Sequence, residues 1–338
     1  MIVRAKAPFR ISVGGGGTDL PPYCTEHGGA IVSFTIDRHI FITIKPRADL
    51  KIRVISTDYK KETIFETGDK NYEDRFALFK GVINVLGIKD GFDIISSSEL
   101  PTGSGMGGSS TLTVSLLGAF NEYYSLGLTK HDIANKAYYI ERVELDQTGG
   151  YQDQFAAAYG GFNYMEFRDD VKVFPLNVSK DVINELMFRL ILCFVGGSHF
   201  SSDIQDEVLA GYTDKIEKKS FLDSMQDLKD VAKGMREVFE LNDLTRLNEF
   251  GKLLHKGWLA KKSLSSKISN PNIEKFYITS LEHGVIGGKL LGAGGGGHLI
   301  LFCEPEKKYQ IIEQMERLGG KIVNFHYNPK GLETWRIK

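Results

Sequence analysis

Cysteine and net charge are both scarce in this chain of 338 residues. The three cysteines are odd in number and lack the spacing of a metal site. Cys193 and Cys303 stand in apolar runs, so we expect buried, reduced thiols. The formal net charge is −1 and no long block of lysine and arginine occurs, which argues against nucleic-acid binding through a globally basic surface. An anionic small ligand would therefore need positive charge that is supplied locally.

Long apolar runs are absent as well. The first residues, MIVRAKAPF, contain no apolar core long enough for a signal peptide, and no stretch reaches the length of a membrane span. We expect a cytoplasmic protein, either a monomer or a homodimer, with neither a membrane nor a nucleic acid as its partner.

Glycine is abundant instead, with 37 residues, and much of it is clustered. Each cluster is short and flanked by apolar periodic segments, which argues against low-complexity sequence. Glycine loses more backbone freedom on folding than any other residue, so four in a row after an early strand must serve a purpose. The clusters are Gly14–Gly17, Gly103–Gly108, Gly149–Gly150 and Gly294–Gly297.

The first hundred residues are rich in β-branched, partly alternating segments, which are typical of strands. Asp37-Arg38 separates two of these segments and predicts a hairpin. A further strand is expected to lead into the second glycine cluster. The expected strands cover residues 1–8, 30–36, 39–46, 51–56 and 92–100.

Helical patterns follow. A short helix is expected around Arg75–Leu86, and apolar spacing predicts another directly after the second glycine cluster. Thr129, with Asp132 three residues on, resembles a capping box for a helix through Leu145.

The pattern restarts near residue 182, which places a domain boundary between about 170 and 185. The whole is α+β, with an N-terminal domain over 1–180 that holds a phosphate-binding loop at 101–110. A C-terminal domain over 181–338 holds a glycine-rich motif at 292–297. Its expected strands cover 188–197, 298–305 and 321–327, and its expected helices cover 215–265, 270–284 and 308–320.

The segment LPTGSGMGGSS, residues 100–110, ends a predicted strand and opens a predicted helix. A helix N-terminus attracts phosphate, and glycines let the backbone approach it closely. Gly103, Gly105 and Gly108 also fit the dinucleotide fingerprint, but no acidic residue ends a second strand about 20 residues on. Ser109 stands where a Walker A loop has lysine. We therefore expect a phosphate cradle, in which Ser109 and Ser110 offer a hydroxyl to Mg²⁺ or a phosphate.

Carboxylates gather in the segment YYIERVELDQTGGYQDQF. For Glu141, Glu144 and Asp146 the ordinary interpretation is a solvated helix face, with Glu141 at its buried edge. Asp153 differs, because two glycines shortly precede it and small apolar residues follow. A kinase needs one carboxylate for Mg²⁺ and another to orient or deprotonate the acceptor hydroxyl, and Glu141 and Asp153 are candidates for this pair.

Together these segments resemble the GHMP kinases, small-molecule kinases named for galacto-, homoserine, mevalonate and phosphomevalonate kinases. Three motifs match in the family's order, APFRISVGGGGTD, LPTGSGMGGSS and GGKLLGAGGGGHLILF, and they extend from Ala7 to Phe302. The resemblance implies a two-domain α+β fold with an S5-like N-terminal domain and a ferredoxin-like C-terminal domain. It also implies ATP and Mg²⁺ as cofactors and a site in the cleft between the domains.

The resemblance assigns roles by position. Asp153 matches the aspartate proposed as base for the acceptor hydroxyl. Arg10 matches a basic residue beside it, which would stabilise the ionised carboxylate and the transferring phosphoryl group. Ser109 and Glu141 match the Mg²⁺ ligands. The residues expected to wrap the ATP phosphates are Pro101, Gly103, Ser104, Gly105, Met106, Gly107, Gly108, Ser109 and Ser110. Those expected to contact substrate are Gly16, Gly17, Thr18, Asp19, Gly150, Asp153, Gly295 and Gly296.

The first motif indicates the substrate. Galactokinases read G-E-H-x-D there, whereas this chain has glycine at the two bulky positions and keeps Asp19, an expected ligand for sugar hydroxyls. GGGGTDLPPY resembles the subgroup that phosphorylates the anomeric hydroxyl of D-glycero-D-manno-heptose 7-phosphate to the 1,7-bisphosphate, for nucleotide-activated heptose of bacterial surface polysaccharide. Fucokinases carry a similar G-G-x-T-D, so another sugar 1-kinase is the alternative.

A sugar that already bears a phosphate needs a second anion site. The richest basic segment is 251–271, and we hypothesise that Lys256, Lys261 or Lys262 contacts the 7-phosphate. A solvated helix face with snorkelling lysines is the other interpretation.

Two further classes stay open. One is an NAD(P)-dependent oxidoreductase built on Gly103–Gly108, and the other is a catalytically silent member of the kinase fold. The joint presence of Ser109, Glu141 and Asp153 argues against the silent member.

Overall fold

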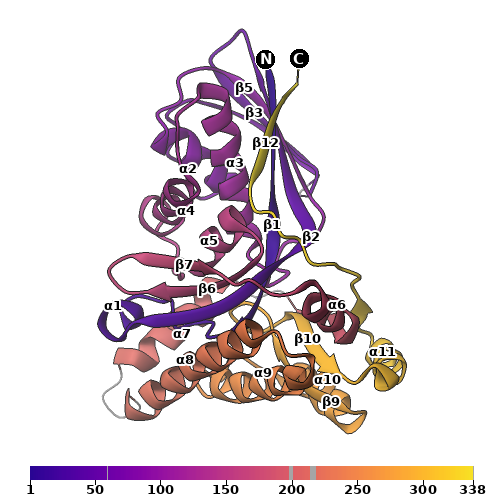
Figure 1. The fold of residues 1–338 in the computed structure, drawn as a ribbon. Coiled ribbons are helices and arrows are strands. Elements are labelled where there is room, and N and C mark those ends of the chain that lie inside the picture. The colour runs from indigo at the N-terminus through magenta and orange to yellow at the C-terminus, as the bar shows by residue number, and fades with distance from the viewer. Residues whose placement is uncertain (59, 198–200, 214–217, 338) are drawn as a thin grey trace.

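The computed structural model describes residues 1–58, 60–197, 201–213 and 218–337, which form two β-sheets covered by helices (Figure 1). The predicted α+β class is confirmed. The larger sheet has the strand order β12-β1-β2-β5-β3-β4, with β6 pairing with β2 and β7 with β6. Its strands are β1 (Ile2–Gly14), β2 (Gly29–Pro46), β3 (Lys51–Ser56), β4 (Lys61–Glu66), β5 (Phe92–Ser98), β6 (Phe162–Phe167), β7 (Val171–Pro175) and β12 (Glu333–Ile337).

The burial of β1 shows how this sheet enters the core. Its first six residues alternate between buried and more exposed positions, whereas every residue from Ala7 to Gly14 is buried. Helix α3 packs on β1 and β2, and α8 also contacts both strands. The helices of this half are α1 (Tyr23–His27), α2 (Ala77–Val85), α3 (Gly108–Tyr124), α4 (Lys130–Tyr139) and α5 (Gln152–Tyr159).

The smaller sheet is antiparallel throughout, in the order β11-β8-β10-β9. Its strands are β8 (Leu190–Gly196), β9 (Val285–Leu290), β10 (Gly297–Cys303) and β11 (Lys321–Ile322). Its helices are α6 (Lys180–Arg189), α7 (Ser201–Thr213), α8 (Lys218–Leu241), α9 (Leu247–Lys262), α10 (Pro271–Glu282) and α11 (Lys308–Arg317). The predicted helical stretches over 215–265 are confirmed as α8 and α9, which are separated by a short break around a 3-10 turn at Leu244–Arg246 and end at Lys262; 215–217 lie outside the described residues.

The last strand returns to the first sheet. β12 pairs antiparallel with β1, from Ile2 opposite Ile337 to Lys6 opposite Glu333, so both ends of the chain lie together at the top of Figure 1. The predicted division at residue 180 assigns this strand to the second half, whereas its hydrogen bonds place it in the sheet of the first.

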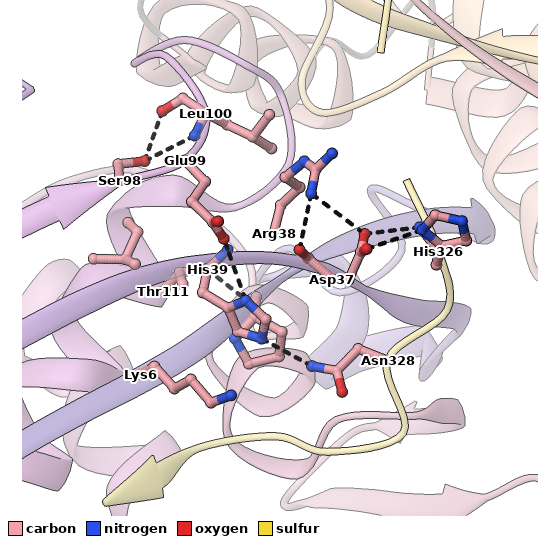
Figure 2. A network of polar contacts seen from close by, with 12 residues as sticks. Lys6, Asp37, Arg38, His39, Ser98, Glu99, Leu100, Thr111, His326 and Asn328 are labelled. Carbon is pink, nitrogen blue, oxygen red and sulfur yellow. Dashed lines mark hydrogen bonds and ion pairs between the residues drawn. The ribbon is translucent and has the colours of Figure 1, made fainter. Parts of the chain in front are cut away.

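The predicted hairpin at Asp37-Arg38 is wrong, because β2 runs unbroken through both residues. The Asp37 carboxylate instead accepts a hydrogen bond from the backbone N–H of His326, at 2.7 Å. His39 donates its N–H to Glu99 at 2.7 Å, and Asn328 contacts the His39 ring at 3.1 Å. Figure 2 shows these contacts. They connect the segment before β12 with β2 and with Glu99, which directly precedes Leu100 and the glycine loop.

The segment 321–327 is only partly the predicted strand. β11 is limited to Lys321–Ile322, and Tyr327 forms an isolated bridge with Ile36 of the other sheet. All three cysteines are free and buried, as predicted for Cys193 and Cys303. No helix among the described residues is long and apolar enough to cross a membrane.

Candidate active site

One large cleft, with a volume of about 990 Å³, lies where the two halves meet. From the first half it is lined by Arg10, Asp19 and Asp153 and by residues 100–105 and 107–110, which include the second glycine cluster and the residues on either side of it. From the second half it is lined by side chains of α7, α9 and β9. The cleft therefore brings together segments that are more than 250 residues apart in the sequence.

The second glycine cluster forms the wall of the cleft at the start of α3. Gly107 precedes the helix with φ 80°, a left-handed conformation that favours glycine, and no side chain caps the helix. The first backbone N–H groups of α3 are thus free of intrahelical partners. This geometry suits phosphate oxygens, as the sequence predicted.

The glycine loop at 100–110 and the C-terminal motif GGKLLGAGGGGHLILF pack backbone to backbone. A Cβ built on Gly105 would lie 2.6 Å from the carbonyl oxygen of Leu291, and one built on Gly292 would lie 2.8 Å from the Cα of Gly105. The ring of His298 is hydrogen-bonded to the carbonyl of Ser104, with Nδ1 and O 2.7 Å apart. The glycine loop at 100–110 is therefore held in shape by the second half of the chain.

Arg10 and Asp153 form a bidentate ion pair. The Arg10 Nε donates to Oδ1 of Asp153 at 2.8 Å and Nη2 donates to Oδ2 at 2.9 Å, while Nη1 donates to the carbonyl of Gly105 at 2.7 Å. Arg10 is buried on β1, whereas Asp153, in the first turn of α5, is partly exposed to the cleft. The fork therefore fixes the carboxylate relative to the glycine loop.

Glu141 is fully buried, on the helical face that Ile133, Ala137 and Ile140 also occupy. The capping box of Thr129 and Asp132 is present, but α4 ends at Tyr139 and a π-helical turn follows over Ile140–Glu144. Such turns are frequent at functional sites. The interpretation of a solvated helix face is therefore wrong for Glu141, whereas its predicted place at the edge of the buried side agrees with the structure, and burial raises the pKa of its carboxyl group.

Glu141 does not itself line the cleft, and its carboxylate has one engaged and one free oxygen. Its Oε2 accepts hydrogen bonds from Ser110 at 2.9 Å and from Gln154 at 3.1 Å and pairs with the Arg142 guanidinium at 3.2 Å, while Oε1 has no hydrogen-bond partner among the described residues. Within that part of the chain no group of three histidine, cysteine or acidic residues is placed to hold a metal. One carboxylate and the hydroxyls of Ser109 and Ser110 suit Mg²⁺, which prefers oxygen ligands and keeps water and phosphate in its shell.

The first glycine cluster contributes to the same cleft. Gly16, Gly17 and Asp19 line it. Asp19 is buried and accepts hydrogen bonds from the N–H of Gln152 at 3.0 Å and of Gly17 at 3.2 Å. Burial raises the pKa of its carboxyl group. A Cβ on Gly150 would lie 2.0 Å from Asp19 Oδ2, so glycine is required there for this carboxylate to fit.

Two regions of the chain match family models, residues 77–161 that of the GHMP kinases N terminal domain and residues 226–321 that of the GHMP kinases C terminal. The chain is also 34% identical, over 99% of both proteins, to the D-glycero-alpha-D-manno-heptose 7-phosphate kinase of Campylobacter jejuni. The chain belongs to the GHMP kinase family. It is therefore a phosphotransferase with an alcohol group as acceptor, and the oxidoreductase alternative is set aside.

Other GHMP kinases are similar over the whole chain. A crystal structure of a D-glycero-D-manno-heptose 1-phosphate kinase from Bacteroides thetaiotaomicron superposes with a TM-score of 0.81, at 29% identity and 99% coverage of both chains. An L-fucokinase/L-fucose-1-P guanylyltransferase of Bacteroides fragilis is 26% identical over 99% of this chain and 38% of its own length. The predicted GHMP kinase fold is confirmed.

Some residues predicted to contact ligands in this GHMP kinase do not line the cleft. The Thr18 hydroxyl is fully buried, donates to the carbonyl of Gly15 at 2.8 Å and accepts from the N–H of Ala30 at 3.0 Å, so it holds the turn. Met106 is buried in the core. Gly295 and Gly296 pack against the backbone of Gly197.

The predicted lysines separate into two groups. Lys256 pairs with Asp227 at 3.1 Å and Lys262 with Glu274 at 2.9 Å, and neither lines the cleft. Lys261 does line it and is 7% exposed. The sequence prediction missed Lys289, a buried cleft residue at the end of β9. The signal that marks it is a lysine inside an apolar strand beside a glycine motif.

Proposed function

We propose that this GHMP kinase transfers the γ-phosphoryl group of ATP to the anomeric C1 hydroxyl of D-glycero-D-manno-heptose 7-phosphate, which yields the 1,7-bisphosphate and ADP. The observation that carries the proposal is the Arg10–Asp153 pair, fixed to the phosphate-binding loop by the Gly105 carbonyl and facing the same cleft as Asp19. It places a carboxylate for an acceptor hydroxyl beside a loop suited to hold a donor phosphate.

The roles follow from this arrangement. The loop and the start of α3 bind the phosphates of ATP through backbone N–H groups. Asp153 accepts a hydrogen bond from the C1 hydroxyl, orients it toward the γ-phosphorus and takes its proton as the new oxygen–phosphorus bond forms and the bond to ADP breaks. Arg10 holds Asp153 in place and lies close enough to stabilise negative charge on the transferring group. Asp19 binds sugar hydroxyls.

A magnesium site completes the proposal. Ser109 and Glu141 would hold the ion, with Ser110 orienting Glu141 through its hydrogen bond. When bound, Mg²⁺ neutralises charge on the phosphates of ATP. The unpartnered Oε1 of Glu141 supports this assignment.

The substrate proposal is supported by the Campylobacter jejuni and Bacteroides thetaiotaomicron relatives, both named for heptose phosphates. Their names differ in the carbon that bears the phosphate, so both isomers belong in any test. The similarity to an L-fucokinase favours a second candidate, a kinase acting on free L-fucose. We propose that the 1,7-bisphosphate serves nucleotide-activated heptose for surface polysaccharide.

The test is a coupled assay of ADP release with Mg²⁺·ATP and a panel of acceptors: heptose 7-phosphate, heptose 1-phosphate, free heptose, L-fucose, galactose and mevalonate. ³¹P NMR of the product identifies the carbon that gains a phosphate. We expect turnover with heptose 7-phosphate and a new resonance at C1, and Asp153→Asn should lower kcat by about 100- to 10,000-fold. Turnover with free sugars alone would refute the proposed substrate.

A further inference from the structure

Two buried lysines face the cleft without an acidic partner. Lys261 of α9 is 7% exposed and Lys289 of β9 is 8% exposed. The Lys261 ammonium donates to the carbonyl of Gly16 at 3.3 Å, and that of Lys289 donates to the carbonyl of Ser12 at 2.8 Å. Neither forms an ion pair with any carboxylate in the described ranges. A buried cation is costly unless it is paired, so the geometry calls for an anion from outside the chain.

A third donor lies beside them. The Ser12 hydroxyl is 3% exposed and has no hydrogen-bond partner among the residues that the structure describes. A Cβ built on Gly16 would lie 3.3 Å from the Ser12 Oγ and 3.8 Å from the Lys289 Nζ, and one on Gly17 would lie 2.9 Å from the Lys261 Nζ. The two glycines thus leave open the space onto which all three donors face.

The charges around this space do not balance. Arg10 is engaged by Asp153, which leaves Lys261 and Lys289 opposite Asp19 alone. Burial, together with the nearby cations Lys261 and Arg10, lowers the pKa of Lys289 to about 7. Burial likewise lowers the pKa of Lys261 to about 8, although Asp19 opposes the shift. An anionic ligand group, such as a phosphate monoester, would offset the excess of positive charge.

We infer that Lys261, Lys289 and Ser12 form an anion subsite, which binds the phosphate that the sugar substrate already carries. The inference rests on the proposed function for the identity of that substrate. The subsite adjoins Gly16 and Gly17, which line the same cleft as Asp19, Asp153 and the loop proposed for the ATP phosphates. One phosphorylated sugar can therefore place its reacting hydroxyl at Asp153 and its own phosphate at the two lysines.

The experiment compares Lys261→Met, Lys289→Met and Ser12→Ala with the wild type and with Lys256→Met. Lys256 is the matched control, because it lies on the same helix as Lys261 but pairs with Asp227 outside the cleft. Methionine keeps most of the side-chain length and removes the charge, so a folded variant is expected, and circular dichroism verifies it. Kinetics are measured with heptose 7-phosphate, free heptose and ATP as varied substrates.

Each lysine variant should raise KM for heptose 7-phosphate about 10- to 100-fold, since a hydrogen bond to a charged group is lost, and leave KM for ATP and kcat/KM for free heptose unchanged. Ser12→Ala should act in the same direction by less. Lys256→Met should match the wild type. A fall in kcat with both acceptors would mean that the lysines contact the transferred group, which overturns the inference while the proposed function stands.

Phosphate binding gives a readout that needs no turnover. With Mg²⁺·ADP present to fill the nucleotide site, inorganic phosphate is titrated by calorimetry into the wild type and each variant. Loss of binding in Lys261→Met and Lys289→Met, but not in Lys256→Met, supports the subsite even if heptose 7-phosphate proves not to be a substrate. Unchanged binding in both cleft variants overturns it.

Discussion

The fork between Arg10 and Asp153 makes a quantitative prediction for Arg10→Lys, a change that keeps the positive charge. Arginine makes three hydrogen bonds here, two to the carboxylate and one to the Gly105 carbonyl. A lysine ammonium reaching the same place replaces one, so two are lost, at about 1.5–3 kcal/mol each for bonds to charged groups. Because the Asp153 side chain is 23% exposed, water compensates part of this loss.

We therefore expect Arg10→Lys to lower the free energy of unfolding by about 2–3 kcal/mol and kcat by about 100-fold. Urea denaturation followed by circular dichroism measures the first, and the ADP-release assay measures the second. Arg10→Met, which also removes the charge, should lower kcat further. Wild-type stability together with wild-type kcat in Arg10→Lys would refute the argument, because charge alone would then suffice. Reduced stability with normal kcat would make the fork purely structural.

Three further predictions concern the rest of the site. KM for the phosphorylated sugar should rise between about pH 7 and 9, because the lysines with pKa values lowered to about 7 (Lys289) and about 8 (Lys261) lose the protons that favour anion binding. A flat KM–pH profile would contradict this. Gly16→Ala should raise KM for the phosphorylated sugar about tenfold without changing KM for ATP, because its Cβ would lie 3.3 Å from the Ser12 hydroxyl and narrow the space beside it. Initial-rate kinetics test this prediction. Glu141→Gln should lower kcat at least about 100-fold and abolish the part of the ATP-induced thermal shift that depends on Mg²⁺. An intact metal-dependent shift would exclude Glu141 as a ligand.

Much of the donor side of the site could be predicted from sequence, because its residues act through local chain geometry. A strand followed by glycines and a helix predicts a phosphate cradle without knowledge of any distant contact. The structure places residues 103–105 and 107–110 of that loop in the cleft. The Arg10–Asp153 pair joins residues 143 positions apart, and only the resemblance to a family indicated it.

The errors arise where a role depends on tertiary contacts. Thr18 stands next to Asp19 in sequence, yet its hydroxyl is used by Ala30 from the neighbouring strand, and spacing cannot reveal this. The sequence alone does not distinguish Lys261 from Lys256 and Lys262. In the structure, carboxylates on α8 and α10 form ion pairs with Lys256 and Lys262. The sequence did not single out Lys289, because the face of the sheet to which its side chain points depends on how β9 pairs with β10.

The glycine clusters and the distant cations are two consequences of one requirement. Glycines let a loop present backbone N–H groups to phosphates, and the loop at 100–110 carries no basic residue of its own. In this chain Gly105 and Gly292 approach so closely that a Cβ on either would overlap backbone of the other motif. The charges come instead from regular elements around the cleft: Arg10 from β1, Lys261 from α9 and Lys289 from β9. Rigid strands and helices hold these cations with a precision that a glycine-rich loop lacks. The near-neutral composition of the chain is therefore compatible with an anionic substrate. A few charged lysines and arginines suffice, because burial lowers the local dielectric constant and so strengthens their attraction to an anion.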